Sequence, residues 1–373
     1  GEFADISTGK LDANAMVEDG EYDFYTSGMK KYRIDTPAFE GPAITIAGNG
    51  ATVGYMHLAD GEFNAYQRTY VLQNFQANRY FLYSEISKKL PRKIAQEART
   101  GNIPYIVMDM LTELTISLPV LEEEQAKIGA FFKQLDNTIA LHQRQQDNYK
   151  QLKKYMLQKI FNQEFRFKDE NGNDYPDWEE IALKELGETF TGLSGKTKEN
   201  FGKGKGKFVT YMNVFSNSTA NLAMTENVEI KDGEKQNEVC YGDIFFTTSS
   251  ETPDEVGMSS VWLSHESNVY LNSFCFGYRL NSESEGKVTH QFLGVQLRAD
   301  HIRKQIVFLA QGSTRFNISK AKLTEIPVYL PAIQEQQKIA DFLSMLDLRI
   351  EQLSQKVELL KEQKKGLIQQ MFV

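Results

Sequence analysis

The feature that most constrains this chain is one helical segment that occurs twice. "EQAKIGAFFKQLD" at Glu124–Asp136 returns as "EQQKIADFLSMLD" at Glu335–Asp347, 211 residues later, with seven of thirteen positions identical. Before it, "LTELTISLP" (Leu111–Pro119) matches "LTEIPVYLP" (Leu323–Pro331). A period of this length is too long for a solenoid repeat and indicates a duplicated domain, each copy with its own helix.

The repeat continues outward from these segments. Phe81–Gly101 aligns without gaps to Phe292–Gly312, and each stretch predicts a basic amphipathic helix followed by a glycine turn. Near the start, Gly1, Glu2, Gly9 and Lys10 match Gly187, Glu188, Gly195 and Lys196 at an offset of 186. The second half carries "DWEEIALKEL" before its glycine, whereas the first half opens at Gly1. We therefore expect the given chain to begin inside its first repeat.

Each repeated segment opens a long heptad-like ladder of mostly apolar residues. Its steps alternate between four and three residues, which is the spacing of a coiled-coil seam, and neither copy contains proline. The ladders predict helices over residues 120–162 and 332–373, each roughly 60 Å long, which run antiparallel if a two-fold axis relates the halves. The seam residues that we expect are Ile128, Leu135, Ile139, Tyr149 and Met156 in the first helix, and Ile339, Leu346, Ile350, Val357 and Leu360 in the second.

The remaining segments are expected to form two α+β domains, over residues 1–119 and 181–331. Short apolar strands alternate with small polar loops in both, and residues 163–180 form a linker with Asn-Gly and Pro turn signals. Between the matching segments the two domains have little sequence in common. The predicted fold is therefore two α+β domains separated by two long helices that form an antiparallel coiled coil, with an internal pseudo-two-fold repeat.

The composition excludes several classes of protein. No run approaches 18 consecutive apolar residues, so we expect no membrane span, and the first residues lack a signal-peptide pattern. The two cysteines show no CxxC spacing, which favours a reduced, cytoplasmic protein.

Basic residues are clustered although the net charge is −8. Arg79–Arg99 holds six basic residues against two acidic ones, Ser194–Lys207 five against one, and Arg298–Lys322 six against one. Binding to phosphate depends on such local clusters rather than on the net charge. We therefore retain nucleic acid as a candidate ligand.

The candidate DNA-binding residues are cations and amides in these clusters and in the predicted loops. Arg92 and Lys93 align with Arg303 and Lys304, and we expect them on one exposed helix face suited to phosphate contacts. The loop and strand candidates are Lys10, Lys30, Lys31, Arg33, Asn49 and Arg68 in the first domain, and Lys196, Lys198, Lys203, Lys205, Lys207, Asn213, Asn217 and Arg315 in the second. Arg, Lys, Asn and Gln are the side chains best suited to base edges.

Motifs for catalysis are not found. "TGLSGKT" (Thr191–Thr197) lacks the first glycine of a phosphate-binding loop, because Phe190 stands there. The five histidines are scattered and form no triad or zinc pattern. We expect no catalytic residue and no metal site in this chain.

The arrangement resembles the specificity subunit of type I restriction-modification enzymes. The residues that carry the resemblance are the repeated "LPVLEEEQAKIGAFFKQLD" and "LPAIQEQQKIADFLSMLD", together with the linker-like "FRFKDENGNDYPDWEEIALKELGE" (Phe165–Glu188). The resemblance covers essentially the whole chain.

Membership of that family would imply a division of labour. Two target-recognition domains would each read half of a split double-stranded DNA target, and the paired helices would act as a ruler of at most roughly 17 base pairs. Two modification subunits would dock on the helices and methylate adenine with S-adenosylmethionine. Two restriction subunits would use ATP and Mg, and this subunit would have no cofactor and catalyse nothing.

One alternative belongs to a different class: a coiled-coil scaffold that presents two small domains to protein or glycan ligands. The duplicated basic helix disfavours it. An enzyme in its own right is the weakest reading, because no catalytic set is present.

Overall fold

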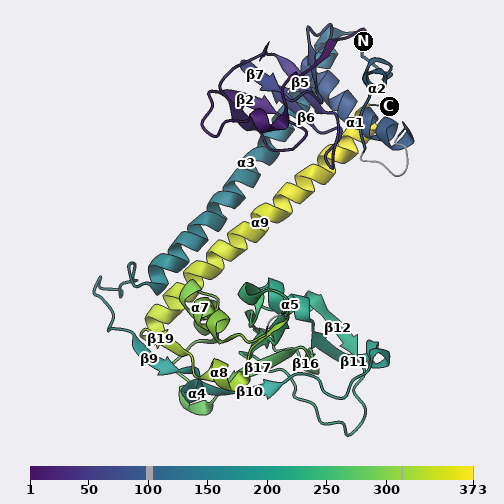
Figure 1. The fold of residues 1–373 in the computed structure, drawn as a ribbon. Coiled ribbons are helices and arrows are strands. Elements are labelled where there is room, and N and C mark those ends of the chain that lie inside the picture. The colour runs from purple at the N-terminus through teal and green to yellow at the C-terminus, as the bar shows by residue number, and fades with distance from the viewer. Residues whose placement is uncertain (98–103, 313, 373) are drawn as a thin grey trace. The chain divides into compact units, whose positions relative to one another are not determined.

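Two long helices dominate the computed structural model, which describes residues 1–97, 104–312 and 314–372. Helix α3 spans Glu122–Phe161 and α9 spans Ile333–Met371 (Figure 1). Three glutamates in the first turn of α3 face the positive end of its dipole, and no proline interrupts either helix. The expected turn at Gly101 lies outside the described residues.

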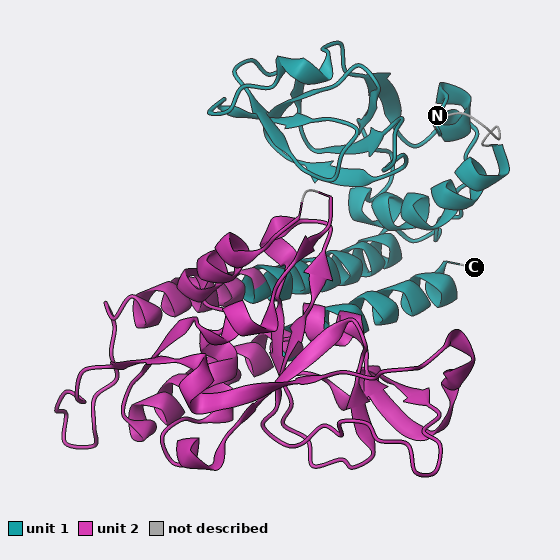
Figure 2. Ribbon diagram, turned by 60° about the horizontal axis from the view of Figure 1, so that its bottom comes forward, with its two compact units in different colours: residues 1–146, 352–373 teal, residues 147–351 magenta. Residues whose placement is uncertain are grey.

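The chain divides into two compact units that share both helices (Figure 2). Unit 1 comprises residues 1–146 and 352–373, and unit 2 comprises residues 147–351. Each unit therefore contains one part of α3 and one part of α9.

In unit 1 the beginning of α3 packs on the end of α9. Phe132 and Phe372 form a buried cluster with Phe81, and Ile139 packs with Val357 and Leu360. In unit 2 the end of α3 packs with the beginning of α9, where Tyr149 and Met156 contact a core that includes Ile339 and Leu346. The helices therefore run antiparallel within each unit, and all ten expected seam residues are buried or half-buried.

Unit 1 contains two sheets and helix α1. The first sheet has the antiparallel order β1-β8-β5-β6, and the second has the order β3-β2-β7-β4 with β2 and β7 parallel. Leu82, Ile86 and Leu90 of α1 pack on the apolar face of the first sheet. The elements are β1 (Asp5–Thr8), β2 (Tyr22–Tyr25), β3 (Tyr32–Ile34), β4 (Phe39–Glu40), β5 (Ala43–Ala47), β6 (Met56–Ala59), β7 (Glu62–Ala65), β8 (Thr69–Gln73), α1 (Arg79–Glu97) and α2 (Met108–Thr112).

Unit 2 repeats this plan. Its four-stranded sheet has the order β10-β17-β13-β15, and its second sheet has the order β12-β11-β16 with β11 and β16 parallel. Two short pairs are added, β14 with β18 and β9 with β19. The elements are β9 (Glu179–Ala182), α4 (Leu183–Leu186), β10 (Gly187–Thr191), β11 (Phe201–Val209), α5 (Tyr211–Ser216), β12 (Thr225–Val228), β13 (Ile244–Thr247), β14 (Ser249–Ser250), β15 (Ser259–Val261), β16 (Val269–Leu271), β17 (Cys275–Leu280), α6 (His290–Gln296), α7 (Asp300–Leu309), β18 (Phe316–Asn317), α8 (Lys320–Thr324) and β19 (Pro327–Leu330).

These matching sheets confirm the predicted α+β class and internal repeat, with one correction at the start of the chain. The expected alignment paired Gly9 with Gly195. Instead, Gly9 packs its Cα against the backbone oxygens of Ala65 and Tyr66, as Gly192 does against the backbone before β17. The offset of the first strand is therefore 183 rather than 186, and Lys10 corresponds to Leu193.

The linker turns where the sequence predicts it. Gly172 of the Asn-Gly pair has a φ of +84°, which favours glycine, and Lys168 bridges to Asp174 across the turn. Arg166 then forms an ion pair with the fully buried Glu335, 2.7 Å between Nη2 and Oε2. Among the described helices, none is long and apolar enough to cross a membrane.

Candidate nucleic-acid interface

In unit 1, three connecting segments meet at one end of the four-stranded sheet. The Gly48 amide donates to the Arg68 carbonyl at 2.8 Å, and the Ile106 amide donates to the Gly48 carbonyl at 2.7 Å. The segments after β5, before β8 and before α2 are thus tied together through the backbone. We call this end of the sheet, in either unit, the loop edge.

A fourth segment, the β2–β3 connection, packs beside them. The Ser27 hydroxyl donates to the Asn49 side-chain oxygen, and His57 Nε2 lies 3.2 Å from the Gly28 carbonyl. These contacts hold the β2–β3 connection, whose Met29 and Lys30 are exposed, against Asn49 and His57. The loop edge of unit 1 therefore brings together two of the predicted residues, Asn49 and Arg68, and Lys30 lies in the adjoining β2–β3 connection.

Unit 2 has the same backbone arrangement at its loop edge. The Thr248 amide donates to the Phe274 carbonyl at 2.9 Å, and the Ile318 amide donates to the Thr248 carbonyl at 3.1 Å. Helix α5 takes the place of the β2–β3 turn, and the Tyr211 hydroxyl donates to the Ser249 carbonyl at 2.8 Å. Phe274 therefore occupies the position that Arg68 occupies in unit 1.

The exposed side chains at the two loop edges differ in chemistry. Unit 1 presents Arg68 and Tyr105, which is 44% exposed, whereas unit 2 presents Phe274, which is 60% exposed, and Arg315. Arg315 Nε donates to Ser249 Oγ at 3.1 Å, which fixes its direction. Arginine forms bidentate hydrogen bonds to guanine, and apolar side chains contact the thymine methyl group. Two like backbones thus carry two different sets of groups able to contact bases.

Other predicted cations of unit 1 are paired within the protein. Lys31 and Arg33 both contact Asp23, at 3.3 and 2.6 Å, and Arg33 Nε also donates to the Gly20 carbonyl. Arg33 is therefore less available for a base edge than we expected. Lys10 is exposed.

The helix cations are only partly as expected. Arg92 and Lys304 are exposed, and Lys93 pairs with Glu97 at 3.2 Å. The expectation that Arg303 lies on an exposed face is wrong, because its guanidinium donates to the carbonyls of Val256 at 2.6 Å and Gly257 at 2.7 Å. Burial lowers the pKa of Arg303 to about 10.

The predicted lysine loop is largely neutralised by glutamates. Lys203 pairs with Glu229 at 3.4 Å and Lys207 with Glu266 at 2.9 Å. Lys196 is 4% exposed and bonded to Glu234 at 2.6 Å, which corrects the expectation that it is a free cation. The hydrogen bond from Lys196, followed by that from the Lys231 amide, lowers the pKa of Glu234 to about 2.

Two further loop cations stay exposed, Lys198 and Lys205.

Asn213 is fully buried, and its amide donates to the Asn221 carbonyl at 2.7 Å, so its selection as a base-reading residue is wrong. Asn217 donates to the Asn213 carbonyl at 3.0 Å and is half-buried.

Sequence reasoning missed Phe274 and Tyr105. The sequence contains one signal for Phe274, which is its position. Phe274 directly precedes the buried strand "CFGYRL", just as Arg68 directly precedes the strand "TYVLQ". Aromatic residues before a strand are common, so the signal becomes specific only when the backbone hydrogen bonds are known.

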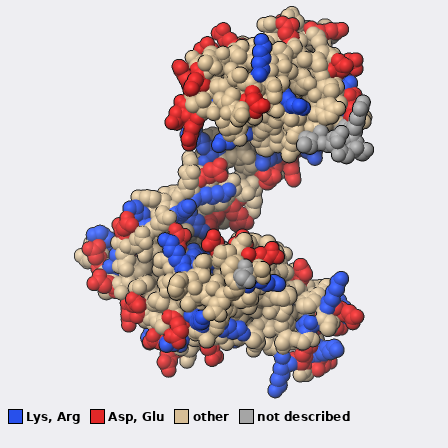
Figure 3. Space-filling view, in the orientation of Figure 1, with Lys and Arg blue, Asp and Glu red and all other residues tan. Residues whose placement is uncertain are grey.

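Charges of both signs are interspersed over the face of the molecule that Figure 3 shows. Among the described residues, no three His, Cys, Asp or Glu side chains gather as a metal site would require. The exposed Arg68, Tyr105, Phe274 and Arg315 give the loop edges hydrogen-bonding and apolar groups.

Comparison with known proteins adds a family match over most of the chain. The family described as "Type I restriction modification DNA specificity domain" matches residues 1–151 and 175–362. A type I restriction enzyme EcoDI specificity subunit from Escherichia coli is 36% identical over 143 residues, which is 38% of this chain and 32% of that protein. The MjaVIII specificity subunit of Methanocaldococcus jannaschii is 24% identical over 323 residues, covering 77% of this chain and 68% of the relative.

The fold is also similar to that of solved structures from type I restriction-modification systems. The type I restriction-modification S subunit from M. genitalium superposes with a TM-score of 0.67 at 18% sequence identity, and the comparison covers 100% of this chain and 94% of that one. At this identity the likeness concerns the fold alone.

Proposed function

This chain belongs to the family of type I restriction-modification DNA specificity domains, and we propose that each of its units reads one half of a split DNA target. In this role the chain is the specificity subunit, binds double-stranded DNA in the cytoplasm and catalyses no reaction itself.

The observation that carries the proposal is the shared backbone of the two loop edges with unlike side chains. The hydrogen bonds at Gly48 and Thr248 have the same partners in the repeat, yet Arg68 faces solvent in one unit and Phe274 in the other. A backbone arrangement shared by the two units, with different exposed side chains in each, suits two readers of different sequences. Arg68, Tyr105, Phe274 and Arg315 are the proposed base contacts.

Phosphate contacts would supply affinity that does not depend on sequence. The exposed cations Lys30, Lys198, Lys205, Arg92 and Lys304 are the best candidates, because no ion pair is recorded for them among the described residues. Lys10, also exposed, is a weaker candidate. Such contacts make binding fall steeply with salt concentration.

The long helices are proposed to carry the partner subunits. Several large apolar side chains remain exposed on them, among them Leu141 and Leu152 of α3 and Met345, Leu348 and Leu359 of α9, each at least 41% exposed. Exposed apolar patches on helices favour contacts with other proteins. Two methyltransferase subunits that use S-adenosylmethionine, and two restriction subunits that use ATP and Mg, are the proposed partners.

The test is to express the full chain with a cognate methyltransferase subunit and to sequence all methylated adenines in the host DNA. We expect one split motif with a fixed gap. The Arg68→Ala variant should alter one half of that motif and the Phe274→Ala variant the other. If no sequence-specific methylation is found and the complex does not bind random duplex DNA at low salt, the proposed function is wrong. The scaffold alternative would then be favoured.

A further inference from the structure

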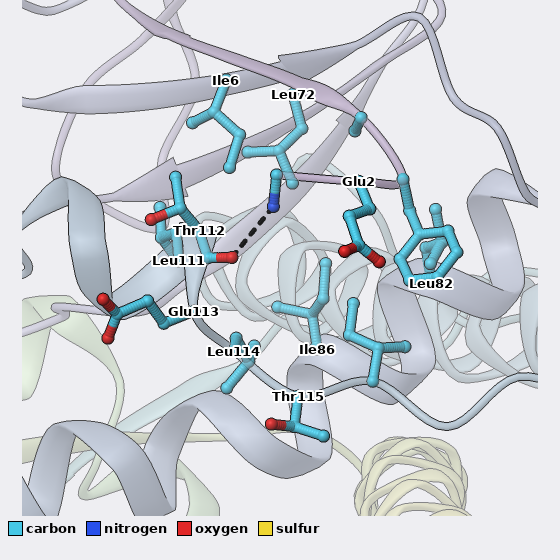
Figure 4. Close-up of a pocket in the computed structure, with 14 residues that line it drawn as sticks. Glu2, Ile6, Leu72, Leu82, Ile86, Leu111, Thr112, Glu113, Leu114 and Thr115 are labelled. Carbon is cyan, nitrogen blue, oxygen red and sulfur yellow. Dashed lines mark hydrogen bonds between the residues drawn. The ribbon is translucent and has the colours of Figure 1, made fainter.

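Phe274 is a large apolar side chain at the loop edge of unit 2 that the protein leaves uncovered. It is 60% exposed, and no contact with another aromatic ring is recorded for it among the described residues. In unit 1, by comparison, Leu72 and Ile86 line one cavity together with other apolar side chains (Figure 4). Single exposed rings are common on protein surfaces, so the meaning of Phe274 depends on how it is held and on what lies beside it.

The backbone of Phe274 is held on both sides. Its amide donates to Asn272 Oδ1 at 2.8 Å, and its carbonyl accepts from the Thr248 amide at 2.9 Å. The next residue, Cys275, is buried in the core that includes Trp262. The ring is therefore carried on a turn whose backbone is already fixed, which lowers the entropy lost when the ring binds a ligand.

Arg315 is held on the adjoining residue of the same segment. Its Nε donates to Ser249 Oγ at 3.1 Å, and Ser249 follows Thr248, which binds the Phe274 carbonyl. In the part of the chain that the structure describes, no bond is recorded for the two Nη groups of Arg315, so both are available to a ligand. Two free Nη groups suit O6 and N7 of guanine, which lie in the major groove. The neighbouring ring is therefore expected to meet the major-groove edges as well.

The major-groove edges of the four bases offer Phe274 one apolar substituent. All four bases present hydrogen-bond donors or acceptors there, and thymine adds the methyl group on C5. A phenyl ring placed on a donor or an acceptor would displace its water without replacing the hydrogen bond, which is unfavourable. When the ring packs on a methyl group, both apolar surfaces leave water, which is favourable.

Unit 1 places a different group at the same backbone position. Arg68 precedes β8 as Phe274 precedes β17, and the Arg68 carbonyl accepts from the Gly48 amide at 2.8 Å. A cationic donor at this position favours guanine. We therefore expect the dependence on a methyl group to belong to the position of Phe274 in unit 2 and not to its counterpart in unit 1.

We propose that the DNA half-site of unit 2 contains a pyrimidine with a methyl group on C5, either thymine or 5-methylcytosine, and that Phe274 recognises it by packing on this methyl group. The inference rests on the proposed function and names the chemistry that one of its two readers requires. Arg315 contacts a guanine close to that pyrimidine, because Thr248 and Ser249, which hold the two groups, are consecutive.

The test uses the complex of the full chain with a cognate methyltransferase subunit, and a duplex that carries the motif found by mapping methylated adenines. Each thymine of the motif is replaced in turn by uracil, which removes the C5 methyl group and keeps every hydrogen-bonding group. One uracil in the half-site of unit 2 should weaken binding about three- to fivefold, as expected for one buried methyl-sized group. Each cytosine is compared with 5-methylcytosine in the same way, which distinguishes the two sources of the methyl group.

Variants of Phe274 assign the effect to its side chain. In Phe274→Ala the loss of the methyl group should make no further difference, whereas Phe274→Leu, which stays apolar, should keep most of the effect. Both variants should melt within about 2 °C of the unaltered chain, because the replaced side chain is exposed. As an internal control, substitutions in the half-site of unit 1 should have the same effect in Phe274→Ala as in the unaltered chain.

The outcomes separate this inference from the proposed function. If binding is sequence-specific but the C5 methyl group makes no difference in the half-site of unit 2, the inference is wrong and the proposed function stands. A ring inserted between base pairs would give that result, because insertion does not need the methyl group. An effect of uracil that persists in Phe274→Ala would also contradict the inference, since another side chain would then contact the methyl group. A complex without any sequence-specific binding would overturn the proposed function and this inference together.

Discussion

Lys153 of α3 holds both carboxylate oxygens of Asp347 of α9, with Nζ–O distances of 2.5 and 2.7 Å. In unit 1, Lys364 contacts Asp136 at 2.5 Å. Adding the repeat offset of 211 to Lys153 and Asp136 gives Lys364 and Asp347. The two ion pairs are therefore copies of one contact, made once in each unit, and they fix the same antiparallel register between the helices.

Reversing one charge of either pair should destabilise the helix packing by a modest amount. For Lys153→Asp we expect a loss of about 0.5–1 kcal/mol, because both side chains are partly solvated. Combining Lys153→Asp with Asp347→Lys should restore most of the loss, as measured by urea denaturation. A double variant no more stable than the single one would show that the pair does not set the register.

Arg68 and Phe274 should each control one half of the DNA target. Removing a base-contacting side chain costs about 1–3 kcal/mol for the base concerned. The Arg68→Ala variant should relax the first half-site alone, as seen in methylated-adenine maps, and Phe274→Ala the second. Lys205→Ala is the matched control, because loss of a phosphate contact should weaken binding to all sequences alike.

Arg303 should matter for folding and its neighbour Lys304 for binding. The Arg303→Met variant leaves carbonyl oxygens of residues 254, 256 and 257 without their donor, which we expect to cost at least about 2 kcal/mol in urea denaturation. Lys304→Met should change stability by less than about 0.5 kcal/mol. It should, however, lower affinity for random DNA. Unchanged stability in Arg303→Met would contradict this division.

The Lys196–Glu234 pair should loosen at low pH. Because the folded state lowers the pKa of Glu234 to about 2, this carboxylate stabilises the loop above its unfolded pKa, about 4.3, and the contribution disappears as pH falls from there towards 2. Amide exchange of residues 229–236 should accelerate over that range. In Lys196→Met the Glu234 pKa, followed by NMR, should move up towards its usual value.

Lengthening both helices should lengthen the gap of the proposed DNA motif. Seven residues inserted after Gln146 and seven after Leu353 preserve the heptad seam and add about 10 Å, or about 3 base pairs. The methylated motif should keep both half-sites and gain that spacing. An unchanged gap would contradict the proposal that the length of the paired helices sets the distance between the two half-sites.

The sequence predicted those parts of the fold that repeat or have strong periodicity. Helix α3 begins at Glu122 and α9 at Ile333, close to the expected residues 120 and 332, because a ladder of apolar residues over forty positions has one simple structural solution. The first strand was misaligned by three residues, since short strands align on a few glycines, and Gly9 matched the wrong one.

Side-chain availability could not be predicted in the same way. Lys196 is covered by Glu234, 38 residues further along the chain, and Arg303 reaches carbonyls of a loop nearly fifty residues earlier. Such pairings follow from tertiary packing, which a charge count does not contain. Phe274 was missed for the same reason, because its equivalence to Arg68 rests on a backbone hydrogen bond.

The main-chain bonds at Gly48 and Thr248 have a consequence for how such proteins diversify. Since the hydrogen bonds at Gly48 and Thr248 use the backbone carbonyls of Arg68 and Phe274 and not their side chains, a codon change at position 68 or 274 leaves these bonds in place. Under the proposed function, single replacements at these positions can then alter the bases that one unit contacts, while the other unit keeps its preference.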